Sequence, residues 1–317
     1  MAKLLKDPRK LIILVIVLAV LYSLPLSISP YLVTVFFFLF TYVILAESYD
    51  IFSGYTGYYN LGHGAFFALG GYTYAILETG RMLPSSVPIF VSFPAAMIVP
   101  ALFAFLISYP FFRLRGAYFA VASFGLIPLL FYLANNLRPI TGGREGIHIA
   151  LPEAGTAIPA YYIGLTVALI AVLTNYLVAK GKFGLALISI REDEDVATEY
   201  GINNFRVKMK ALVLSAAFAG LAGATFVYQL GVACPDGILG MELALAPVVM
   251  TIFGGLGSYV GALLGAVVLV AIQEVLWTQM TYFHLFTYGI LLLIVGIIAP
   301  GGIVRVGPLK RIFRPPE

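Results

Sequence analysis

Long apolar runs alternate with short polar stretches along almost the whole chain. Many of the runs approach or exceed the roughly 20 residues that a helix needs to cross the hydrocarbon core of a bilayer. The pattern therefore predicts a ladder of membrane-spanning helices. The apolar runs cover residues 11–24, 31–51, 61–77, 87–112, 117–134, 161–179, 211–230, 243–272 and 283–299.

Composition strengthens this prediction. Hydrophobic residues make up 61% of the 317 residues and charged residues 11%, whereas soluble domains are about 45–50% apolar and about 25% charged. A chain of this length has room for about eight to ten spans. We therefore expect an all-α polytopic membrane protein in which residues 1–317 form a single transmembrane domain.

The basic residues predict an orientation, because cytoplasmic loops carry an excess of Lys and Arg. With the N-terminus inside, only Arg81, Arg138 and Arg144 of the 19 basic residues fall in outer loops. The first apolar run could alternatively be a signal peptide, but it lacks a convincing cleavage site. We therefore expect a multi-pass protein of the cell membrane with both termini in the cytoplasm.

This orientation also constrains the number of spans in the run at residues 243–272, because both ends of the chain must lie on the same side. A single span there would leave the basic C-terminal tail outside. We therefore predict either two short spans or a re-entrant pair, broken within the sequence GGLGSYVG at residues 254–261.

Two loops differ from the other connections. The loop at residues 180–210 holds five of the 15 acidic residues within eight positions, together with six basic residues, and the orientation places it in the cytoplasm. The loop at residues 135–160 is the longest outer segment and is rich in turn formers. It could be a landing platform for an external protein.

Two glycine-rich stretches, at residues 54–71 and 254–265, interrupt apolar runs. Such breaks predict discontinuous helices near the bilayer midplane, whose free N–H and C=O groups suit a zwitterion such as an amino acid. The alternative is close helix packing through small residues. On the first interpretation the substrate pathway includes Gly54, Gly57, Asn60, Gly62, His63, Gly64, Gly254, Gly255 and Gly257.

Few ionisable residues fall near membrane depth. Glu47 and Asp50 are expected to reach water at the end of a span, His63 to make one internal hydrogen bond, and Glu274 to lie at an interface. No basic residue falls inside a predicted span, so a proton relay built on paired charges has little support.

The sequence predicts no enzyme and no cofactor. One cysteine and three scattered histidines exclude a zinc-type spacing. The phosphate-binding motif G-x-x-x-x-G-K-[ST] is absent, so energy must come from another chain. Nothing in the sequence is typical of a nucleic-acid surface.

The polar loop contains DVATEYG at residues 195–201. It loosely matches the E-A-A-x-x-x-G pattern of ABC-importer permeases, in which a short helix ended by glycine docks on an ATPase. The match predicts ATPase coupling by Arg191, Glu192, Asp195, Ala197, Glu199 and Gly201.

The surrounding sequence is a more specific match. The chain resembles the permeases of branched-chain amino acid ABC transporters, of the LivM type. The resemblance runs from about residue 45 to residue 303 through blocks at residues 54–72, 113–126, 141–147, 184–224, 253–266 and 288–303, in the family's order. Residues 58–60 and Asp50, which replaces a usual amide, depart from the family pattern and put the substrate in doubt.

The resemblance implies an importer subunit without catalytic residues. Its partners would be a second, LivH-type permease, two ATPase subunits and an extracytoplasmic amino-acid-binding protein. The substrate would be leucine, isoleucine, valine or a related amino acid; urea, amides or other amino acids are alternatives. A stand-alone secondary transporter is a further alternative, for which the sequence offers only Glu47, Asp50 and His63 as ion ligands.

Overall fold

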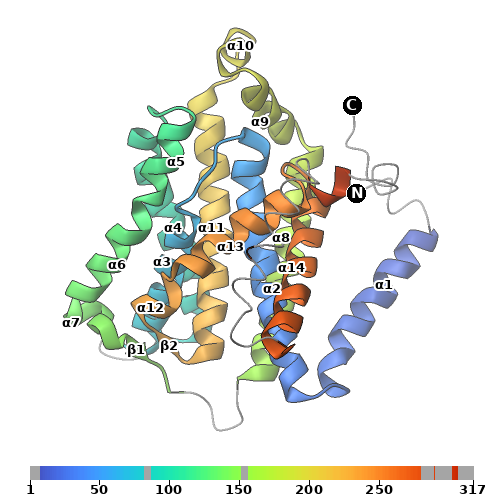
Figure 1. Ribbon diagram of the computed structural model, residues 1–317, viewed down its shortest axis with the longest axis vertical. Coiled ribbons are helices and arrows are strands. Elements are labelled where there is room, and N and C mark those ends of the chain that lie inside the picture. The colour runs from blue at the N-terminus through green and yellow to red at the C-terminus, as the bar shows by residue number, and fades with distance from the viewer. Residues whose placement is uncertain (1–7, 82–86, 151–155, 280–288, 290–301, 306–317) are drawn as a thin grey trace.

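The computed structural model describes residues 8–81, 87–150, 156–279, 289 and 302–305, which form a helical bundle (Figure 1). Its longer helices are α1 (Pro8–Ser23), α2 (Pro30–Tyr49), α3 (His63–Glu78), α4 (Ile89–Phe111), α5 (Ala117–Phe124), α6 (Leu126–Asn136), α8 (Ala157–Lys180), α9 (Lys182–Glu192), α11 (Asn204–Leu230), α13 (Met241–Gly254) and α14 (Tyr259–Gln279). Shorter elements are η1 (Leu24–Leu26), the π-helical turn η2 (Asp50–Gly54), α7 (Arg138–Thr141), η3 (Gly143–Glu145), α10 (Glu194–Glu199), α12 (Pro235–Ile238) and η4 (Ile303–Arg305).

The prediction of an all-α polytopic membrane protein is confirmed. Among the described residues, seven helices are long and apolar enough to cross a bilayer, and α1 carries a shorter apolar segment. The predicted last span, at residues 283–299, lies outside the described residues apart from residue 289. The run at residues 243–272 is divided into α13 and α14 by a break at residues 255–258, as the charge parity requires.

Helix α11 lies at the centre of the bundle, in contact with α2, α3, α4 and α8. Small residues allow this close packing: a Cβ atom on Gly70 of α3 would lie 2.1 Å from the carbonyl oxygen of Gly220 in α11. Outer helices carry exposed apolar side chains such as Phe90 (87%), Leu106 (68%) and Tyr118 (78%). An apolar exterior around a packed centre suits lipid as the solvent.

The two ends of the bundle differ. At one end, which we call the α10 end, α9 and α10 project beyond α2 and α11 (Figure 1). At the other end, β1 (Ile147–His148) pairs antiparallel with β2 (Val232–Ala233). Arg81 donates to the Pro139 carbonyl at this second end, at 3.2 Å. The predicted outer loop is thus partly ordered into α7, η3 and β1.

Candidate functional site

The most polar cluster of the α10 end is built around the short helix α10. Its start is stabilised by the Asp193 carboxylate, which accepts hydrogen bonds from the backbone N–H groups of Asp195 and Val196 at 2.9 and 3.0 Å. Its end is stabilised by Gly201, whose φ of +82° is a left-handed conformation that glycine adopts without strain. A short helix ended by Gly201 is therefore present, as predicted.

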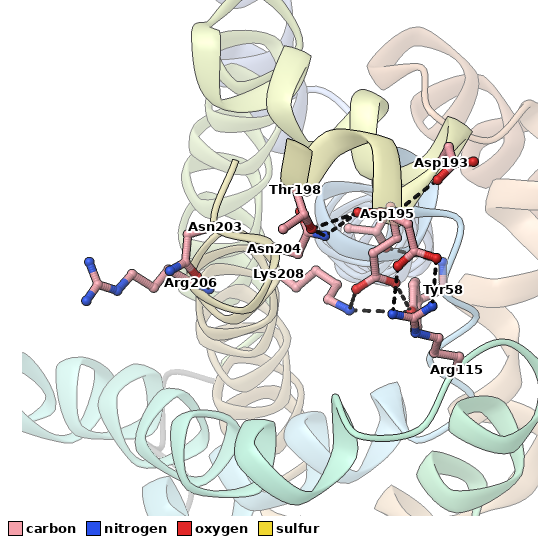
Figure 2. A network of polar contacts seen from close by, with 11 residues as sticks. Tyr58, Arg115, Asp193, Asp195, Thr198, Asn203, Asn204, Arg206 and Lys208 are labelled. Atoms are coloured by element: carbon pink, nitrogen blue, oxygen red, sulfur yellow. Dashed lines mark hydrogen bonds and ion pairs between the residues drawn. The ribbon is translucent and has the colours of Figure 1, made fainter. Parts of the chain in front are cut away.

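An ion pair joins α10 to the central helix. The Lys208 ammonium group lies 2.5 Å from the Glu194 carboxylate, with the lysine side chain 2% exposed and that of Glu194 17% exposed. The hydroxyl of Tyr58 donates to the other oxygen of Glu194 at 2.6 Å. Lys208 also lies 4.5 Å from the centre of the Tyr58 ring. We call Tyr58, Arg115, Glu194, Asp195 and Lys208 the α10 network (Figure 2).

The network connects α10 to three other parts of the chain. Tyr58 belongs to the segment between η2 and α3, Lys208 to α11, and Arg115 to the turn after α4. Arg115 donates to both carboxylate oxygens of Asp195, at 3.0 and 3.3 Å, in an exposed ion pair. The start of α11 adds a further tie, because the Asn204 side-chain amide donates to the Glu194 carbonyl at 2.6 Å.

Electrostatics favour the ionised form of Glu194. Partial burial, the largest single effect, raises the pKa of this carboxyl, but hydrogen bonds from Lys208 and Tyr58 and the charges of Lys208 and Arg115 outweigh burial and hold the pKa below its ordinary value. Burial and the hydrogen bond to Glu194 raise the pKa of the Tyr58 phenol, so Tyr58 remains a donor. The Glu194 carboxylate is therefore ionised at neutral pH.

A second cluster, the glycine junction, lies beside the network and consists of Asp50, Gly54, Gly57, Arg191 and Gly257. Arg191 of α9 donates to the Gly54 carbonyl at 3.1 Å. The Asp50 carboxylate accepts from the backbone N–H of Gly257 at 2.7 Å. A Cβ atom on Gly54 would lie 2.7 Å from the Gly257 nitrogen. The two glycine breaks, far apart in sequence, therefore meet.

This contact corrects the predicted depth of the breaks. Arg191 extends from α9, outside the spanning helices, and still reaches Gly54 and Gly257. The junction therefore lies at the α10 end of the bundle rather than half way along it. Glu47 and Asp50, which were expected to reach water, are both 0% exposed, and α2 packs against α8, α11, α13 and α14.

The other glycines of the predicted pathway lie where helices pack closely. A Cβ atom on Gly62 would meet the Ser123 carbonyl of α5, one on Gly64 would meet Ala244 of α13, and one on Gly254 would meet the Gly261 carbonyl. The Gly255 carbonyl lies 2.5 Å from the Cβ position of Gly261. These contacts are those of closely packed helices.

Two polar residues of this stretch are also buried. The Asn60 side-chain oxygen accepts from the Gly62 N–H at 3.2 Å. His63 lies 2.9 Å from the Ser48 hydroxyl, which confirms the expected internal hydrogen bond.

The predicted coupling residues fall into two groups. Glu192, Asp195 and Glu199 are exposed, whereas Ala197 is 2% exposed and faces inward. Glu194 and Lys208 were not among the predicted site residues. Lys208 had been placed in the loop, but α11 begins at Asn204 and includes it, so the expectation that no span carries a basic residue is wrong for this helix.

Comparisons with known proteins identify the family of the chain. The family described as "Branched-chain amino acid transport system / permease component" matches residues 31–296. The LivM permease protein of Salmonella typhimurium is 28% identical over 80% of this chain and 65% of its own length. LivM of Escherichia coli is 29% identical over 90% of this chain and 73% of its own length. The LivH permease protein of Escherichia coli is 23% identical, over 86% of this chain and 94% of its own length. No solved structure matches the chain.

Proposed function

The chain belongs to the branched-chain amino acid transport permease family, and we propose that it is a membrane subunit of an ATP-driven importer for leucine, isoleucine and valine. Its partners in this proposal are a second permease, two ATPase subunits and an extracytoplasmic binding protein. The proposal for a second permease draws on the Escherichia coli relatives, because LivM and LivH are both named as permease proteins of a high-affinity branched-chain amino acid transport system, and each is similar to this chain.

The observation that carries the proposal is the attachment of α10 to the interior. An exposed helix without internal ties could move freely when a partner binds. Here Glu194 bonds both to Lys208 of the central helix and to Tyr58, four positions along the chain from Gly54. Asp195 bonds to Arg115 beyond the end of α4. A displacement of α10 by an ATPase would therefore shift three membrane segments at once.

The surface of α10 is suited to docking. Val196 (45% exposed) and Tyr200 (84% exposed) lie among the exposed acidic groups of Asp195 and Glu199. An apolar centre with a charged rim is common at protein interfaces. We propose that these side chains contact the ATPase, whereas Ala197 packs on the buried face of α10. The glycine junction is then the part of the pathway closest to the ATPase.

Reconstitution tests this function directly. With all partners in proteoliposomes, labelled leucine should enter only with ATP inside and binding protein outside. Each omitted partner should abolish uptake. Ion-gradient-driven uptake by this chain alone would instead favour a secondary transporter. Competition by urea, amides or other amino acids for the binding protein would decide the substrate class.

The orientation is tested by labelling. Because Cys234 is the single cysteine, Cys234→Ser gives a cysteine-free background. A membrane-impermeant thiol reagent outside the cell should label Arg144→Cys and spare Glu199→Cys. The reverse pattern would contradict cytoplasmic termini and a cytoplasmic α10 end.

A further inference from the structure

A buried acidic pair lies where α2 passes into η2. Glu47 and Asp50 are both 0% exposed. The side-chain amide of Asn175 in α8, also 0% exposed, donates to Glu47 Oε2 at 2.7 Å and to Asp50 Oδ2 at 3.1 Å. One NH₂ group therefore serves two carboxyl groups inside the bundle.

The two carboxyl groups have unequal surroundings. Asp50 Oδ1 accepts the Gly257 N–H at 2.7 Å, and Asp50 interacts electrostatically with the Arg191 guanidinium. Within the part of the chain that the structure describes, the side chain of Glu47 has only Asn175 as a hydrogen-bond partner. Among the described residues, both Glu47 Oε1 and Asn175 Oδ1 are buried without a partner.

These two orphaned atoms belong to the same pair of side chains. An ionised carboxylate can only accept, so Glu47 Oε1 and Asn175 Oδ1 would both be unpaired acceptors, a costly arrangement in a buried site. A protonated carboxyl has one O–H donor. A proton on Oε1 would turn this unpartnered acceptor into a donor, and Asn175 Oδ1 is an unpartnered acceptor on the residue that already donates to Oε2. A single proton therefore suits both orphaned atoms.

Charge balance gives an independent argument. Besides each other, the titratable groups of the described residues that interact with the pair are Tyr49, Tyr55 and Tyr259, which are neutral phenols at pH 7, and Arg191. One proton on the pair leaves a single negative charge opposite the single positive charge of Arg191. Two ionised carboxylates would leave an uncompensated charge inside a membrane bundle.

We propose that Glu47 is a proton-binding site: it is held as a neutral carboxylic acid by Asn175, while Asp50 remains ionised and fixes the α13–α14 break through Gly257. The ligand is a proton. A monovalent cation bound between the same oxygens is the competing occupant.

Infrared spectroscopy of the full chain in lipid tests the assignment. The wild type at pH 7 should show the C=O stretch of a protonated carboxylic acid. Glu47→Gln should remove this band and Asp50→Asn should retain it. A band lost in Asp50→Asn and kept in Glu47→Gln would overturn the assignment. So would identical carboxylic-acid bands in the wild type and in Glu47→Gln, or a wild type with no such band.

Thermal unfolding provides a second readout. Gln offers a carbonyl acceptor and an N–H donor where the neutral acid has its carbonyl and its O–H, so Glu47→Gln should melt within about 2 °C of the wild type, whereas Glu47→Ala should melt lower. Exchange of Na⁺ or K⁺ for a large organic cation should leave the wild-type melting temperature unchanged. A loss of stability in Glu47→Gln as large as in Glu47→Ala, or stabilisation of the wild type by Na⁺ or K⁺, would identify a bound cation instead.

Discussion

The ammonium group of Lys208 and the carboxylate of Glu194 lie 2.5 Å apart, although one belongs to the buried central helix and the other to the projecting helix α10. The lysine is covered by the rings of Tyr58 and Phe112, at 4.5 and 5.1 Å from their centres. Removing one member of such a pair leaves the other poorly satisfied.

We therefore expect Lys208→Met to lower the free energy of unfolding by about 1–3 kcal/mol and to uncouple ATP hydrolysis from uptake. Lys210→Met removes the same charge two residues further on, from an exposed side chain, and should change stability by less than about 0.5 kcal/mol. Thermal unfolding in detergent and uptake in proteoliposomes measure both effects. Equal behaviour of the two variants would contradict a special role for Lys208.

The ion pair also predicts a pH dependence. The pKa of Glu194 is below its ordinary value of 4.5 in the folded chain, so its stabilising contribution is complete above pH 4.5 and is lost as the pH falls through the lowered pKa. Glu194→Gln should remove this part of the acid sensitivity. Unfolding measured between pH 6 and pH 3 should show a smaller loss of stability for Glu194→Gln than for the wild type; parallel curves would refute the ionised pair.

Gly54 is expected to tolerate no side chain. A Cβ atom there would lie 1.9 Å from Asp50 Oδ1, so Gly54→Ala must displace Asp50 from the Gly257 N–H. A cost of about 1–3 kcal/mol follows from overpacking alone, with loss of uptake. Gly164→Ala in α8 is the control, because its Cβ would make only ordinary contacts, the nearest at 3.5 Å from Phe37. It should be neutral or slightly stabilising in thermal unfolding.

Gly201 should respond to conformation rather than to size, because a Cβ atom there would meet nothing within 4 Å. Gly201→Ala should cost about 1–2 kcal/mol from its positive φ, and Gly201→Asn less, since Asn tolerates this region. Gly201→Pro should abolish ATPase coupling without preventing membrane insertion, because it also removes the N–H that bonds to Thr198 at 2.9 Å. Normal uptake by Gly201→Pro would rule out docking through this helix end.

The parts of the fold that depend on local pattern were predictable. Apolar runs located the spans, charge parity required a break between α13 and α14, and the position of Gly201 indicated a helix end. Lys208 also carried a signal that was missed: it lies four residues before Leu212 and seven before Ser215, and both are buried. This spacing places Lys208 on the buried face of a helix that begins at Asn204. The sequence therefore contains enough information to predict that Lys208 is buried.

The remaining contacts depend on long-range packing. Asn175 meets Glu47 from 128 residues away, and no periodicity in either segment indicates that α8 lies beside α2. The same is true of Gly54 and Gly257, where sequence indicated two breaks but not their contact. Glu47 and Asp50 are buried by these long-range neighbours. Their position at the end of a span, which is all that the sequence shows, predicts contact with water instead.

The small ladder between β1 and β2 has a mechanical consequence. β1 precedes α8 and β2 follows α11, so this part of the chain leaves one end of the bundle, turns through α9 and α10 at the other, and returns to pair with its own beginning (Figure 1). Helices α8 and α11 are thus the two arms of a helical hairpin, with the β1–β2 ladder at one end and α10 at the other. We therefore expect a force on α10 to tilt α8 and α11 together rather than to slide one helix along the other.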